Sequence, residues 1–270
     1  ESWNGSSWTE VADLNTTAGY GAQTIGSSNT NALACGGYTG TADTVNTETW
    51  NGTSWTETGN IPTSTANLGG AGTNTAGLSF AGRTPSLTTA TNEFTGAGAN
   101  IGAWSSAPDI NTSRGFGGGG AGIYTSALLF GGNVQPTYTE YYNGSSWTEI
   151  ADLNTGKNKT LGFGVYTAAI NASGDPGSPT GGSDKTELFN GSSWTEIADQ
   201  NQASEQRASV SGTSTAGLIF GGQLPGPPMQ AAAEQWNGSA WTEVGDLNTA
   251  RYLLSGSGTT TAGLAFGGDV

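Results

Sequence analysis

The stretch Trp236-Asn237-Gly238-Ser239-Ala240-Trp241-Thr242-Glu243-Val244 determines how the rest of the chain is interpreted. Asn-Gly between two runs that carry aromatic residues is a strong β-hairpin signal, because both residues tolerate the positive φ of a two-residue type I′ turn. Alternation along the arms assigns Glu234 and Trp236 to one register and Trp241 and Glu243 to the other. We therefore expect a tight antiparallel hairpin with a large ring on each arm.

Closely similar stretches recur along the whole chain. They begin at Trp3, Trp50, Tyr142 and Phe189, and a longer, degenerate copy runs from Phe94 to Trp104. The second tryptophans of the six copies are 47, 49, 43, 47 and 47 residues apart. An even period of this length is typical of a repeat architecture, in which each unit buries its rings against its neighbours. We therefore interpret the tryptophan column as packing between units rather than as a set of sugar-stacking platforms.

Each repeat contains four short runs typical of β-strands. In the last repeat, residues 251–258 form the first run and residues 261–268 the second, which ends in Gly-Gly. The aromatic hairpin that should follow is found instead at residues 1–11, so the two chain ends are expected to pair and close a ring. The second runs are rich in Ala and Gly, which predicts inner strands near the ring axis, where neighbouring units approach closely.

The order of these signals resembles the kelch repeat, in which Gly-Gly, Glu-x-aromatic, Trp and Asn-Thr-x-Arg follow one another. The residues that carry the resemblance most clearly are Phe220-Gly221-Gly222, Glu234-Gln235-Trp236, Trp241 and Asn248-Thr249-Ala250-Arg251. The resemblance implies an all-β, six-bladed β-propeller of four-stranded antiparallel blades. It would be a single domain over residues 1–270, with the last blade completed by residues 1–12. The amino-acid sequence of the repeat is also similar to that of repetitive kelch-like proteins of marine bacteriophages.

Charge is sparse and acidic, with 21 Asp and Glu against 7 Lys and Arg, which gives a net charge of −14. This balance weighs against nucleic acid as a partner, since a basic stripe is the usual footprint of such proteins. No apolar run reaches the roughly 18 residues of a membrane span, so no membrane insertion is expected. No signal peptide is recognisable, and the start at Glu1 suggests processing or excision from a longer chain. The single cysteine, Cys35, excludes an internal disulfide framework and is expected to be a small buried residue.

The sequence has no histidine, which removes the most common general base and metal ligand. Copper oxidases with kelch-type propellers need histidine ligands, so the resemblance does not imply that activity here. Carboxylates recur in two columns, which are Glu10, Glu57, Glu149, Glu196 and Glu243, and Asp13, Asp109, Asp152, Asp199 and Asp246. A column present in nearly every repeat favours strand-edge solubility and turn capping over the paired acids of a glycosidase. We therefore expect no enzymatic activity, no cofactor and no metal site.

Two sets of residues are candidates for ligand binding. The loops after Gly-Gly differ in length and character, and they contain Tyr38, Arg83, Tyr138, Asp184, Gln223 and Met229. In a propeller these loops share one face with the blade-to-blade connections, which suits a binding surface, although drift of unconstrained loops also explains the variation. The second set is Arg114, Arg207 and Arg251, at the start of first strands, where the kelch pattern faces the upper funnel. These arginines either form a small anion site or brace neighbouring carboxylates.

Together these observations favour a non-enzymatic binding or display module, located on a virion surface or otherwise extracellular, that recognises a surface glycan or a protein receptor through its loop face. The alternative is a structural decoration or fibre subunit that packs against other virion proteins or against copies of itself. A glycosidase that uses carboxylates alone is a third hypothesis, and the sequence contains no unique acid pair to support it.

Overall fold

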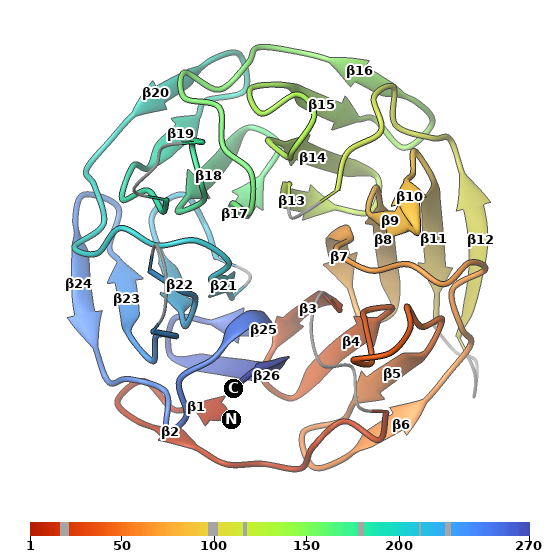
Figure 1. Cartoon of the computed structure of the whole chain (residues 1–270), viewed down its shortest axis with the longest axis horizontal. Coiled ribbons are helices and arrows are strands. Elements are labelled where there is room, and N and C mark those ends of the chain that lie inside the picture. The colour runs from red at the N-terminus through yellow and green to blue at the C-terminus, as the bar shows by residue number, and fades with distance from the viewer. Residues whose placement is uncertain (17–21, 97–101, 116–117, 178–180, 211, 225–227) are drawn as a thin grey trace.

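A computed structural model describes residues 1–16, 22–96, 102–115, 118–177, 181–210, 212–224 and 228–270. The described strands form six four-stranded antiparallel sheets, arranged as blades around a central axis, and no helix occurs among the described residues (Figure 1). The chain is therefore a six-bladed β-propeller, as the repeat period and the resemblance predicted.

Each blade contributes its four strands in order from the axis outward. The first three blades are β3 (Gln23–Ser28), β4 (Asn31–Cys35), β5 (Thr47–Trp50) and β6 (Trp55–Glu57); β7 (Gly69–Thr73), β8 (Ala76–Phe80), β11 (Thr91–Thr95) and β12 (Ala103–Ala107); and β13 (Gly119–Ile123), β14 (Ser126–Phe130), β15 (Thr139–Tyr142) and β16 (Trp147–Glu149). A small hairpin of β9 (Arg83–Thr84) and β10 (Ser86–Leu87) lies in the loop between β8 and β11.

The other three blades follow the same order. They are β17 (Leu161–Val165), β18 (Ala168–Ala172), β19 (Glu187–Phe189) and β20 (Trp194–Glu196); β21 (Ala208–Ser209), β22 (Gly217–Phe220), β23 (Ala233–Trp236) and β24 (Trp241–Val244); and β25 (Tyr252–Thr259), β26 (Ala262–Asp269), β1 (Ser2–Trp3) and β2 (Trp8–Thr9).

The ring is closed by the two ends of the chain. In the sixth blade β1 pairs with β26, with Ser2 opposite Leu264 and Trp3 opposite Gly263. Figure 1 shows the first and last strands side by side in this blade. The predicted closure is confirmed, and it covers two strand edges that would otherwise be open to pairing with other chains.

The strands nearest the axis differ from the expectation. The Ala- and Gly-rich second runs form β4, β8, β14, β18, β22 and β26, which are second from the axis, while the first runs form the innermost strands. The prediction that the second runs are the inner strands was therefore wrong by one position. The second runs are buried between blades, as in β14, where residues from Ala127 to Phe130 are all buried.

The Asn-Gly turn also differs from the expected type. None of the five Asn residues in these turns has a positive φ, whereas Gly5 has φ +95°. The Asn4 side-chain oxygen instead accepts hydrogen bonds from the backbone N–H groups of Ser6 and Ser7, each at 3.0 Å. This four-residue loop places Trp3 directly opposite Trp8, with ring centroids 5.4 Å apart. Both rings thus share one face of the blade, not opposite registers.

The tryptophan column packs between blades, as predicted. In four blades the second Trp of the hairpin meets a Phe on the second strand of the preceding blade, at 4.9 Å for Trp8 and Phe220 and 4.7 Å for Trp55 and Phe266. Cys35 ends that strand in the first blade, and the Trp104 ring N–H donates to the Thr47 hydroxyl of that blade at 3.1 Å. In the fourth blade Ala172 ends that strand, and Phe163 from the innermost strand packs against Trp241 instead, at 6.4 Å. The Phe163 ring on the innermost strand thus fills the space that the smaller Ala172 leaves on the second strand.

Candidate functional site

The loops between second and third strands share one face of the ring with the blade-to-blade connections, and we call this the loop face. In the pairs 36–37, 131–132 and 221–222, the second glycine donates its N–H to a carbonyl of the adjacent connection. The bonds from Gly37 to Thr65, Gly132 to Lys157 and Gly222 to Arg251 are all 2.9 Å long. Equivalent bonds start at Gly82 and Gly174, so the expected shared face is confirmed and every variable loop begins from a fixed anchor.

These anchors need two consecutive left-handed residues. Gly36 has φ +64° and Gly37 has φ +106°. A Cβ on Gly36 would lie 2.4 Å from the carbonyl oxygen of Thr65, which no side chain could accept without a shift. Ala81 and Ser173 occupy the first position in two blades with φ of 60° and 56°, a conformation that is costly for residues with a Cβ.

A column of buried glutamates holds neighbouring blades together at this face. The carboxylate of Glu48 accepts hydrogen bonds from the backbone and side-chain N–H groups of Asn15, both at 2.9 Å, and from the backbone of Thr16 at 2.8 Å. The other glutamates that accept from both groups of an asparagine are Glu1, Glu140, Glu187 and Glu234. We call each such set a glutamate latch.

Sequence reasoning noticed the residues of the latch but not their pairing. The signal was available, since Asn and Glu are 33 residues apart in three of the latches. The second blade lacks the latch among its described residues, because Pro62 stands where the other connections carry Asn and provides neither an N–H nor an amide. Asn92 also replaces the glutamate, since it stands opposite Ser79 as Glu48 stands opposite Ala34. Glu93 is the next residue on this strand and is half-buried.

The three candidate arginines serve these latches. Arg114 pairs with Glu140, Arg207 with Glu234 at 2.8 Å, and Arg251 with Glu1 at 3.2 Å. The side chains of Arg114 and Arg207 are fully buried, and burial lowers the pKa of each guanidinium while its glutamate raises it. The expectation that these arginines brace carboxylates is confirmed. Each binds a different glutamate, so their charges are not gathered into one anion site.

Lys157 replaces the arginine in the fourth blade. Its amine is buried and donates a 2.7 Å hydrogen bond to the carbonyl of Lys185, in the variable loop of that blade. Burial lowers the pKa of Lys157 to about 8, although Glu187 opposes the shift. A lysine with three donors and no planar fork cannot reproduce the arginine pairing, so here it anchors a loop backbone instead.

The loop residues predicted as binding candidates fall into separate clusters. Arg83 lies 5.8 Å from the ring centroid of Tyr38, and its guanidinium is 3.7 Å from Asp43, so the loops of the first two blades meet there. Gln223 forms a β-bridge with Met229 in the fifth blade. Tyr138 and Asp184 are half-buried in two further loops, where their backbone carbonyls accept from Arg114 and Gln200 respectively.

A second polar cluster links the fourth and fifth blades. The Lys159 amine is 2.9 Å from Glu205 and 3.9 Å from Asp175, and the Gln223 amide donates to the same Glu205 carboxylate at 3.2 Å. Lys159, Asp175 and Glu205 were not predicted as candidates, because nothing in the repeat marks them. Two carboxylates around one ammonium leave this cluster with a negative balance.

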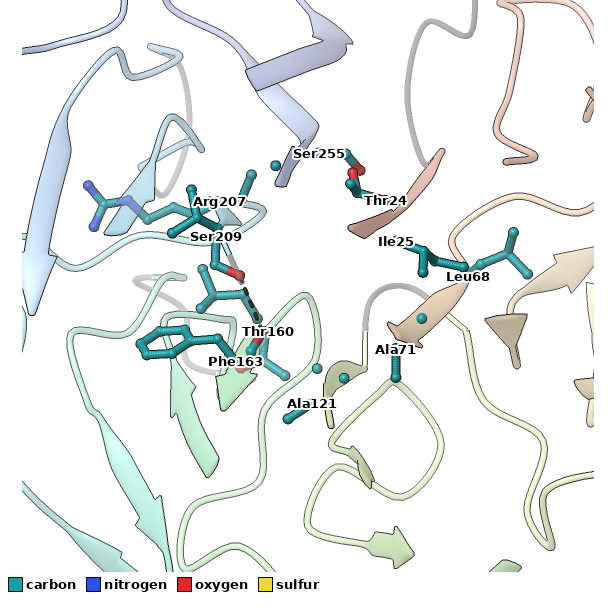
Figure 2. Close-up of a pocket in the computed structure, with 18 of the residues that line it drawn as sticks. Thr24, Ile25, Leu68, Ala71, Ala121, Thr160, Phe163, Arg207, Ser209 and Ser255 are labelled. Atoms are coloured by element: carbon teal, nitrogen blue, oxygen red, sulfur yellow. Dashed lines mark hydrogen bonds between the residues drawn. The ribbon is translucent and has the colours of Figure 1, made fainter. Parts of the chain in front are cut away.

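An axial cavity of about 200 Å³ lies where the innermost strands converge (Figure 2). All six innermost strands contribute to its wall, including Thr24, Gly120, Gly162, Ser209 and Ser255. Glycine is needed at the closest approaches, since a Cβ on Gly162 would lie 2.3 Å from the Phe130 ring and 2.9 Å from the Gly120 carbonyl oxygen. Sequence reasoning did not identify this cavity, because its wall consists largely of small residues and backbone.

Four equivalent residues line the cavity where the connections from the loop face enter the innermost strands. They are Asn67, Lys159, Gln206 and Leu253, with φ of 56°, 52°, 57° and 53°. The backbone N–H of Gln206 donates to Lys159, and that of Leu253 donates to Gln206, both at 3.2 Å. We call this ring the cavity mouth. It joins the axial cavity to the polar cluster at Lys159.

Among the described residues no group of three or more carboxylate or thiol side chains could hold a metal ion. No helix within the described ranges is long and apolar enough to cross a membrane. Burial raises the pKa of the Cys35 thiol to about 12, which fits the inert, buried role expected of it. No protein-family model matches the chain, and no curated protein matches it.

Proposed function

We propose that this propeller is a non-enzymatic binding module that recognises a glycan on a cell or particle surface through its loop face. The observation that supports it is the contrast between anchors and loops. The anchor bonds repeat at the same length in three blades, while the loops they hold differ in length and chemistry. A rigid scaffold with variable loops on one face is a common way to build a recognition surface.

The distribution of carboxylates supports a binding function over hydrolysis. A buried and an exposed glutamate stand directly opposite each other on neighbouring strands, as in Glu48 and Glu57, and the same pair recurs in three more blades. A pair repeated this often is part of the fold, and its buried member is already engaged in a latch. We further propose that this is a kelch-type chain displayed on a virion or cell exterior. The resemblance to kelch repeats and to repetitive bacteriophage proteins supports this part of the proposal.

Two loops are the best targets for testing this function. Residues 176–182 and 224–228 would be replaced by short Gly-containing turns, with Asp175 and Gln223 retained because their backbones pair with Asn158 and Glu205. Residues 178–180 and 225–227 of these loops lie outside the described residues. We expect the wild-type propeller to bind selectively on a glycan array and the loop variant to lose that binding at an unchanged melting temperature. Equal binding by both proteins would contradict the proposal.

A structural function is the second candidate, and one observation favours it. Ile123 and Val165 are each 50% exposed at the ends of the first strands of their blades, on the face opposite the loops. The equivalent residues in two other blades are Thr73 and Thr259. An apolar pair on neighbouring blades fits packing against another protein. A double change of Ile123→Thr and Val165→Thr should then abolish incorporation into particles or self-association in ultracentrifugation, and an unchanged assembly would count against it.

A further inference from the structure

We propose that the axial cavity is the binding site for one neutral sugar ring of the recognised glycan, which enters through the cavity mouth. This inference rests on the proposed glycan-binding function and deepens it, because it assigns the terminal ring to the cavity and leaves the outer part of the glycan to the variable loops. The argument comes from the chemistry of the wall, the charge at the mouth and the size of the cavity.

The wall offers both donors and acceptors. Each innermost strand pairs on one side only, so the N–H and C=O groups of its other edge are directed toward the axis. Some of these groups are satisfied by the neighbouring strand, as when Ser209 donates to Gly162 at 3.2 Å and Ser255 to Ala22 at 2.5 Å. Hydroxyl groups both donate and accept, so a polyhydroxylated ligand can satisfy a mixed set of backbone groups that an ammonium or a carboxylate would satisfy only in part.

The charge around the cavity disfavours an anionic ligand. Among the described residues of its lining, Lys159 and Arg207 are the two with cationic side chains. The Arg207 guanidinium extends away from the cavity toward Glu234 (Figure 2). Lys159 is held between Glu205 and Asp175, and the whole chain has a net charge of −14. A carboxylate or phosphate would therefore enter against the local field, whereas a neutral sugar would not.

Size and polarity at the mouth also fit one ring. The volume of about 200 Å³ is below the roughly 300–1,000 Å³ of pockets for drug-sized ligands, which limits the occupant to a small unit. The mouth includes a half-buried apolar residue, Leu253, and the amide side chains of Gln206 and Asn67. A sugar ring has the same combination of a C–H face and a polar edge.

The test uses neutral methyl hexosides, with a methyl sialoside as the anionic comparison. Saturation-transfer NMR on the full chain should detect the neutral glycosides, and crystals soaked in them should show the ring in the axial cavity. Gln206→Leu and Asn67→Leu should each weaken binding roughly three- to tenfold, the loss of about one net hydrogen bond. Leu253 already occupies an equivalent left-handed position, so Leu is compatible with the backbone there. Gln235→Leu, on the third strand of the same blade and outside the cavity lining, is the matched control.

Three results would decide the matter. Density for a hexoside in the cavity, with affinity lost in Gln206→Leu and kept in Gln235→Leu, would support the inference. Glycan binding that depends on loops 176–182 and 224–228 but is unchanged by both mouth variants, with only water in the cavity, would overturn the inference and leave the proposed function standing. No binding of any neutral saccharide by the wild type, free or on the array, would overturn both.

Discussion

Replacing Glu234 by glutamine is expected to destabilise the propeller strongly, although the number of heavy atoms is unchanged and no cavity is created. The Glu234 carboxylate pairs with the Arg207 guanidinium at 2.8 Å, and both side chains are at most 1% exposed. The same carboxylate accepts from the backbone and side-chain N–H groups of Asn201 at 2.7 and 2.9 Å. A neutral amide would leave a buried guanidinium without its counter-charge and would place N–H donors against other donors.

The size of the effect follows from the loss of one partner of a buried ion pair, which costs about 3–5 kcal/mol. With 270 residues and roughly 2.1 cal/mol/K of unfolding entropy for each, one kcal/mol shifts the melting temperature by about 1.8 °C. We therefore expect Glu234→Gln to melt about 5–9 °C below the wild type. Urea titration should show the same loss as a lower midpoint at an unchanged slope.

The matched control is Glu93→Gln in the second blade. Glu93 lies on the third strand of that blade, one residue beyond the latch position, which Asn92 occupies. Its side chain is half-buried, and Pro62 replaces the asparagine of the latch. A partly exposed carboxylate without a buried partner contributes about 1 kcal/mol or less, so this variant should melt within about 2 °C of the wild type. Equal shifts in the two variants would refute the reasoning, because the latch would then not be the source of the stability.

Three further predictions concern other single sites. Phe163→Ala should cost about 3–5 kcal/mol in urea titration, and adding Ala172→Phe should recover at least half, since four other blades place their ring at that position. No recovery would show that the two positions are not exchangeable. Burial lowers the pKa of Lys157 from 10.5 to about 8, so the unfolded chain binds more protons than the folded chain between these pH values. The free energy of unfolding, measured relative to Lys157→Met, should therefore rise by about 3 kcal/mol from pH 7.5 to 10.5, and a difference that does not change with pH would contradict the prediction. Gly36→Ala and Gly40→Ala both place a Cβ on a residue with positive φ, but only the Gly36 variant brings that Cβ within 2.4 Å of a backbone atom. Gly36→Ala should therefore lower the free energy of unfolding by about 2 kcal/mol more than Gly40→Ala in thermal melting, and similar losses would exclude the clash as the cause.

Local signals were sufficient for much of the fold. The period of the second tryptophans predicted six units, and the half-repeat offset at the two ends predicted closure, because both depend only on which residues recur and where the chain begins its cycle. The packing of the Trp column followed from the same logic, since a residue present in every unit must meet a similar neighbour each time. For the three arginines the sequence left two alternatives, and the structure decided for bracing.

The predicted turn type and the predicted innermost run were both wrong, because each depends on tertiary packing and not on the local sequence. Asn-Gly has the dihedral freedom for a type I′ turn, but pairing Trp3 directly with Trp8 buries two rings on one face, which a two-residue turn would prevent. Likewise, small residues near the axis suited either of the first two runs. Which run is innermost depends on the chain direction after each connection.

Sequence by itself determined what each repeat contains: strands, hairpins, Gly-Gly anchors and an acidic surface. Only the tertiary structure decided what lies between repeats. The glutamate latches join residues that are 33 positions apart in three cases and 247 apart in the blade that closes the ring, and the axial cavity is bounded by strands from all six blades. The physical reason is that periodicity reports the surroundings of a residue within its own unit, whereas a cavity or a buried ion pair depends on how the units converge in space.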